Sequence, residues 1–212
     1  MAESKVETKD TVPLWLAVAI TVCVSLPFGI WLGNYNLPIW ASFIVWAEYF
    51  ALGAKPSALK IIVPAYFLGC VAAAIIMTAY IAVSKALGDG TILTMGSWSF
   101  TYDNLALFIA AFIGFCIFIF AMKWFPVTQT GSLPYFNGIS MMLAVFFTGA
   151  FNTIVPADFD ANLLPYVLPT VAGLGALLAG LLGAFLGWFN IVILFPRPVK
   201  TAPASGQQPV GV

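Results

Sequence analysis

The sequence predicts an all-α fold: a polytopic membrane protein with six transmembrane helices, arranged as two inverted three-helix repeats. Three observations lead to this prediction. The composition is too apolar for a soluble domain, six apolar runs are long enough to cross a bilayer, and two of those runs resemble each other at a constant offset. Together they indicate a chain that is embedded in a bilayer and built from two related halves.

The composition excludes most soluble classes of protein. Of the 212 residues, 62% are hydrophobic and 8% are charged, and the mean hydropathy is +1.02. Soluble domains carry about 25% charged residues, which cover their surface. The equal numbers of basic and acidic residues, 8 of each, give no basic excess for binding a nucleic acid, and 3 cysteines are too few for a disulfide scaffold.

Six runs are long and apolar enough to be membrane spans, because about 20 apolar residues cross about 30 Å of hydrocarbon. The last run is too long for one straight crossing, and Pro165 and Pro169 favour a span that begins near Pro169. The predicted runs are Val12–Gly33, Pro38–Ala54, Ile61–Ser84, Asn104–Met122, Asn137–Val155 and Leu163–Phe195.

The basic residues of the loops predict the orientation. With six spans, only Lys85 lies on one side of the membrane, and an excess of Lys and Arg marks the cytoplasmic side. Both termini are therefore predicted to be cytoplasmic, with a short segment over 1–11, an uncleaved first helix, and a disordered tail over 196–212. The residues on the cytoplasmic side are Lys5, Lys9, Lys55, Lys60, Lys123, Arg197 and Lys200.

An internal repeat relates the second and fifth spans. Residues 37–54 read LPIWASFIVWAEYFALGA and residues 133–150 read LPYFNGISMMLAVFFTGA, with 5 of 18 positions identical. Each half then holds three spans, and an odd number of crossings inverts the second copy relative to the first. Inverted repeats are common in transporters, whose substrate sites lie at the repeat interface near the midplane. The alternative is two ordinary helices that both begin after Leu-Pro.

Glu48 is the acid placed deepest within any predicted span. A charged side chain at the centre of a bilayer costs at least about 2.5 kcal/mol, so Glu48 is expected to face protein or water. The functional interpretation is a site for a cation or a proton, or a carboxylic acid that binds a polar solute. The structural interpretation is a hydrogen bond from Glu48 to a neighbouring polar side chain that holds the bundle together.

The fifth span carries a stripe of polar residues that could line a path. Spacings of three and four place these residues on one face of a helix, and the repeat offset makes that face equivalent to the face of Glu48. The two faces are expected to meet across a pseudo-two-fold axis, although ordinary hydrogen bonding between helices explains the stripe equally well. The pathway residues predicted with Glu48 are Asn137, Ser140, Thr148 and Asn152.

The sixth span is rich in glycine and contains the small-residue motif Gly183-x-x-x-Gly187. Such faces let helix backbones approach closely, either within one chain or between two copies. Because six helices are few for a complete transporter, we expect a homo-oligomer, with Gly183 and Gly187 as its candidate seam.

No catalytic constellation is found in the sequence. The chain has no histidine, its three cysteines are isolated from one another, and no glycine-rich loop leads into a helix in the manner of a phosphate site. We therefore expect neither enzyme activity nor catalytic residues, and no metal or cofactor. The expected partners are the lipid bilayer and a small solute or ion, with no nucleic acid.

Two stretches carry a resemblance to a known family. Trp40–Lys60, WASFIVWAEYFALGAKPSALK, and residues 131–150, GSLPYFNGISMMLAVFFTGA, resemble the YcdZ-like family of small bacterial inner-membrane proteins, which share a domain of unknown function. The resemblance spans about residues 12–195. It implies a bacterial inner-membrane location, and it carries no catalytic or binding residue over to this chain.

These observations predict a small membrane channel or transporter for an ion or a small polar solute. The alternative is a non-transporting accessory or structural subunit that packs beside a larger membrane complex. A transporter requires Glu48 and the polar stripe to converge on a water-accessible cavity. An accessory subunit instead requires a dry core and an apolar outer patch.

Overall fold

The structure is a computed structural model that describes residues 8–30, 37–87, 102–194 and 197–198. It is all-helical apart from one pair of two-residue strands. Residues 1–7 of the predicted segment 1–11 and most of the predicted tail lie outside the described residues, as does the end of the first predicted span. The helices are α1 (Leu14–Ile30), α2 (Ile39–Ala51), α3 (Leu59–Leu87), α4 (Tyr102–Ala121), α5 (Pro126–Thr130), α6 (Ser132–Thr148) and α7 (Leu164–Leu194).

Three of these helical segments are long and apolar enough to cross a membrane, namely Pro56–Leu87, Leu105–Trp124 and Leu164–Leu194. Each includes most of a predicted span. The other three predicted spans correspond to α1, α2 and α6, which have 17, 13 and 17 residues. At 1.5 Å per residue, α2 is about 20 Å long, which is shorter than the hydrocarbon core.

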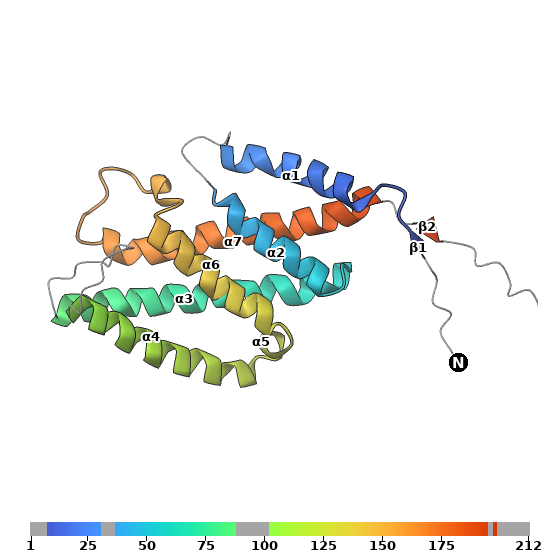
Figure 1. Cartoon of the computed structure of the whole chain (residues 1–212). Coiled ribbons are helices and arrows are strands. Elements are labelled where there is room, and N and C mark those ends of the chain that lie inside the picture. Colours follow the sequence, from blue (N-terminus) through green and yellow to red (C-terminus); the bar gives the residue numbers. More distant parts are fainter. Residues whose placement is uncertain (1–7, 31–36, 88–101, 195–196, 199–212) are drawn as a thin grey trace, which may run out of the picture.

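The two longest helices form the centre of the molecule. Figure 1 shows α3 and α7 side by side and running in opposite directions, with α2 and α6 crossing them diagonally. Helix α2 packs mainly on α7, whereas α6 packs mainly on α3. The outer helices follow the same rule, since α1 lies along α7 and α4 lies along α3.

Glycine permits the two close crossings. A Cβ on Gly183 of α7 would meet the backbone of Ser42 in α2, and a Cβ on Gly69 of α3 would meet the backbone of Tyr135 in α6. The expected role of Gly183 and Gly187 at a homo-oligomer seam is therefore corrected. Gly183 and Gly187 are buried within the chain, where Gly187 lies against the side chain of Tyr49.

The bounds of α6 also differ from the prediction. The fifth span was predicted over Asn137–Val155, but α6 begins at Ser132 and ends at Thr148. It begins earlier because Pro134 falls in its first turn, where proline is tolerated. It ends earlier because Gly149 adopts a left-handed conformation with φ of 66°, a common helix terminator. Asn152 consequently lies beyond α6, in the short 3-10 helix η4 (Asn152–Ile154).

The two ends of the helical body are tied together. Strand β1 (Thr8–Lys9) pairs antiparallel with β2 (Arg197–Pro198). The amides of Thr11 and Val12 also donate to the carbonyl oxygen of Leu194, at 3.0 and 3.3 Å. The segment before α1 and the segment after α7 therefore meet at one end of the molecule (Figure 1).

Candidate functional site

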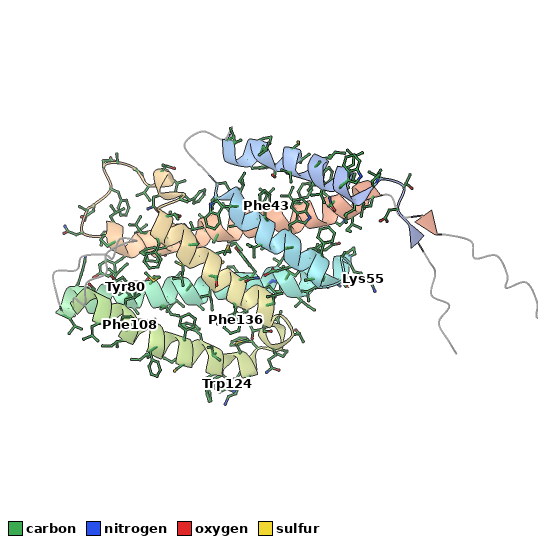
Figure 2. All side chains as sticks on the ribbon, viewed as in Figure 1. Phe43, Lys55, Tyr80, Phe108, Trp124 and Phe136 are labelled. Atoms are coloured by element: carbon green, nitrogen blue, oxygen red, sulfur yellow. The ribbon has the colours of Figure 1, made fainter. Side chains whose placement is uncertain are left out.

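The candidate site lies where α2 meets α6. Glu48 belongs to the third turn of α2, and only 2% of its surface is exposed. The side-chain amide of Asn137 on α6 donates to Glu48 Oε1 at 2.5 Å. The structure thus brings together two of the five predicted pathway residues, although they are 89 positions apart in the chain. Figure 2 labels Phe43 on α2 and Phe136 on α6, the two helices that meet at this site.

Half of the Glu48 carboxyl group has no hydrogen-bond partner. Among the described residues, Oε2 is buried and accepts no hydrogen bond. The hydroxyl group of the adjacent Tyr49 is likewise buried without a partner. Buried polar atoms are normally hydrogen-bonded, and an unsatisfied one costs about 1–3 kcal/mol. An unsatisfied carboxyl oxygen in the core is therefore a feature that folding alone does not favour.

The other residues of the polar stripe do not reach Glu48. Ser140 and Thr148 are exposed, and each hydroxyl donates to a carbonyl oxygen four residues earlier in α6, Phe136 and Ala144 respectively. Asn152 lies in η4, beyond the end of α6. The face of α6 that turns inward is instead apolar and packs on α3 through Tyr135, Gly138, Ile139, Met142, Val145 and Phe146.

Two polar side chains of α3 lie next to the site, and the sequence analysis did not select them. The Tyr66 hydroxyl donates to the carbonyl oxygen of Ala176 in α7 at 3.3 Å, and the Cys70 thiol donates to that of Gly138 in α6 at 3.5 Å. Both side chains are almost fully buried. Their spacing of four on one helix was the available signal, but tyrosine and cysteine are ordinary core residues in so apolar a chain.

A second buried polar contact joins α1 to α7. The Asn190 amide donates to Thr21 Oγ1 at 3.0 Å, and Thr21 in turn donates to the carbonyl oxygen of Ala17 at 2.8 Å. Asn190 is fully buried, and its Oδ1 has no hydrogen-bond partner among the described residues. The signal in the sequence was an amide in the last third of an otherwise apolar span.

Neither Glu48 nor Asn137 lines the apolar cavity between α3 and α7. It has a volume of about 660 Å³, lies between α3 and α7, and is almost entirely apolar. Phe67, Val71 and Ile75 of α3 contribute to its wall, together with Leu174 and Leu177 of α7. None of the five predicted pathway residues lines it. The convergence of Glu48 and the stripe on one cavity is thus not seen in this conformation.

The chemistry of the Glu48 site is that of hydrogen bonding and charge. It contains one acid and one amide. Within the described ranges, no group of three or more His, Cys, Asp or Glu side chains is arranged to hold a metal ion. Comparisons with models of protein families, with curated proteins and with solved structures gave no match.

Proposed function

We propose that the protein is a small membrane channel or transporter for an ion or a small polar solute, with Glu48 and Asn137 at the centre of its pathway. The observation that carries this proposal is the buried, half-satisfied carboxyl group of Glu48 at the contact between α2 and α6. Ionisable residues inside membranes are costly, and they typically mark ion or substrate pathways.

The proposal includes six membrane crossings in two inverted repeats, α1–α3 and α4–α7. The packing supports it, because α2 contacts α7 in the way that its counterpart α6 contacts α3. The Gly-Ala pair that ends each repeated segment adds further support. Gly53 and Gly149 both have positive φ, 91° and 66°, just after the ends of α2 and α6.

The short helices α2 and α6 are the elements that we expect to move. Each is followed within two residues by a left-handed glycine, and their lengths of 13 and 17 residues are at or below the lower limit for a simple membrane span. Interrupted helices at a repeat interface commonly form the substrate sites of transporters. Separation of α2 from α6 towards one face of the membrane would expose the Glu48–Asn137 pair to water on that face.

We also propose a bacterial inner-membrane location, with both termini in the cytoplasm. The resemblance to the YcdZ-like family and the excess of basic residues on one side support this placement. The pairing of β1 with β2 agrees with it, because chain ends that meet imply an even number of crossings. The proposed homo-oligomer has its seam on surfaces other than the buried Gly183 and Gly187.

A solute screen on purified protein in proteoliposomes tests the proposal. We expect at least one ion or small polar solute to be taken up by the wild type, and Glu48→Gln to abolish that uptake at unchanged folded yield. Ser140→Ala is the matched control, because the exposed Ser140 hydroxyl bonds only to its own helix. Loss of folded yield in Glu48→Gln, with no flux of any solute in the wild type, would favour the accessory subunit instead.

A further inference from the structure

The surroundings of Glu48 identify which ion this acid can take. One carboxyl oxygen, Oε1, accepts the amide hydrogen of Asn137, whereas Oε2 is buried and has no partner among the described residues. An ionised carboxylate buried in this way needs a positive charge beside it, because burying an unpaired charge is strongly unfavourable.

The helices that pack against α2 supply no such charge. Helices α1, α6 and α7 contain no Lys or Arg, and Glu48 is the one charged residue of α2. In α3 the lysines are Lys60 and Lys85, both near the helix ends and both exposed. The remaining titratable groups on these five helices are neutral tyrosines and thiols: Tyr49, Tyr66, Tyr80, Tyr135, Tyr166, Cys23 and Cys70.

A metal cation does not fit the position. Hard cations require several oxygen ligands in place of their water, six or more for Mg²⁺ and Ca²⁺. Glu48 is the one carboxylate here, and Asn137 turns its amide nitrogen towards it, so the neighbouring group is a donor and not a ligand. A proton has no such requirement, because it binds to a single oxygen.

We propose that the ion taken up by Glu48 is a proton, carried on Oε2, and that Glu48 is the site through which transport is coupled to proton movement. This inference rests on the proposed function. When α2 and α6 separate, the O–H bond of Glu48 breaks and its proton passes to a water molecule. The carboxylate then remains solvated, with Asn137 still donating to Oε1. Water that reaches the open site from the opposite face then gives a proton to Oε2, which restores the acid before the contact closes, so one proton crosses in each cycle.

This arrangement links closure of the α2–α6 contact to protonation of Glu48. The closed conformation accepts Glu48 as a neutral acid and excludes its carboxylate, because Oε2 has no cationic partner among the described residues. The α2–α6 contact therefore closes again only after Glu48 has been protonated. Asn137 is a positioning residue in this scheme, because its amide fixes Oε1 and leaves Oε2 as the oxygen that carries the proton.

Infrared difference spectroscopy between acid and alkaline pH tests the proton on Glu48 without any transport assay. In the full-length protein reconstituted in liposomes, we expect a carboxylic-acid C=O band that titrates and that Glu48→Gln abolishes. Asn137→Ala should shift the band, since it removes the hydrogen bond to Oε1. The matched control Asp158→Asn, an acid-to-amide change in an exposed loop, should leave the band in place. Absence of the band, or its suppression by Na⁺ or K⁺, would overturn the inference.

Proton flux into the same liposomes, followed with an internal pH-sensitive dye, separates this inference from the proposed function. We expect flux in the wild type and in Asp158→Asn, and only background flux in Glu48→Gln. A titrating band without flux of protons or any solute would refute the transporter and leave the protonated Glu48 standing. Solute uptake that requires Glu48 but is indifferent to a pH gradient would refute proton coupling and leave the transporter standing.

Discussion

The two halves of the molecule share a packing plan but not their polar residues. Helix α2 packs on α7 as α6 packs on α3, and α1 lies on α7 as α4 lies on α3. At the repeat offset, however, Glu48 corresponds to Ala144, and Asn137 corresponds to Ala41. The shared packing plan is therefore accompanied by alanine at one position of each pair and by a polar side chain at the other.

The contacts of the outer helices α1 and α4 also differ in their side chains. Where α1 meets α7, Asn190 donates to Thr21 in a fully buried contact. Where α4 meets α3, a Cβ on Gly114 would meet the apolar side chain of Ile76. The comparison teaches that small residues at the crossings serve the architecture of both halves. Each of the two polar contacts, between α2 and α6 and between α1 and α7, instead pairs one residue of the first half with one residue of the second, so the polar side chains need an explanation beyond the shared packing.

The largest effect is expected where both halves need glycine. Gly69→Ala and Gly183→Ala each place a Cβ against the backbone of a crossing helix, and such overpacking should cost about 3 kcal/mol of unfolding free energy, the upper end of its usual range. Gly173→Ala is the control, because the nearest atom to its Cβ would be 3.7 Å away. Folded yield and thermal unfolding in detergent measure the effect. A large loss at one glycine with tolerance at the other would mean that the two crossings are not equivalent.

Asn137→Ala makes the second half match the first at this position. It removes the donor to Glu48 Oε1 and leaves both carboxyl oxygens buried without a partner, which should cost about 1–3 kcal/mol. Thermal unfolding measures the loss of stability, and uptake by proteoliposomes measures the loss of function. Unchanged stability would show that Glu48 finds another donor.

The double substitution Thr21→Val with Asn190→Leu replaces the hydrogen bond of the α1–α7 contact with apolar side chains. Hydrogen bonds between membrane helices contribute about 0.6 kcal/mol on average, so unfolding should shift by about 1 kcal/mol or less. Solute uptake should stay at the wild-type level. Loss of uptake at full stability would extend the functional pathway to this second contact.

The smallest effect is expected on the exposed side of α6. Ser140→Ala and Thr148→Val remove hydroxyls that bond within their own helix, so stability should change by less than about 0.5 kcal/mol. Uptake should also be unchanged. A strong reduction of uptake by either variant, at normal folded yield, would show that the whole polar stripe of the fifth predicted span takes part in the transport pathway.

The helical class and the apolar helices were predictable from the sequence, because hydropathy reports directly on length and burial. Glu48 was also predictable as a site residue, since an acid within a span stands out against its neighbours. Its contact with Asn137 was expected from the repeat offset, and the structure brings the two together. The prediction of six spans in inverted repeats stays a prediction, supported by the packing.

Other features depend on information that a one-dimensional pattern does not contain. Small residues such as Gly183 indicate that another helix packs closely against this one, but they do not show which helix it is. In the structure it is α2 of the same chain. Helix α6 begins at Ser132, which places Pro134 in the first turn, where proline is tolerated. The sequence pattern did not show that the helix begins before this proline. Asn190 was missed because a single amide gives no periodic signal.

The pairing of β1 with β2 has a consequence for the order of the chain. Lys9 and Arg197 are neighbours in that pair, so a short linker could join the two ends into a closed ring. A circular permutant that starts in the second half would then present the same helices in a new order, with every contact between α2 and α7 and between α3 and α6 preserved. The architecture therefore depends on which helices meet and not on which half is synthesised first.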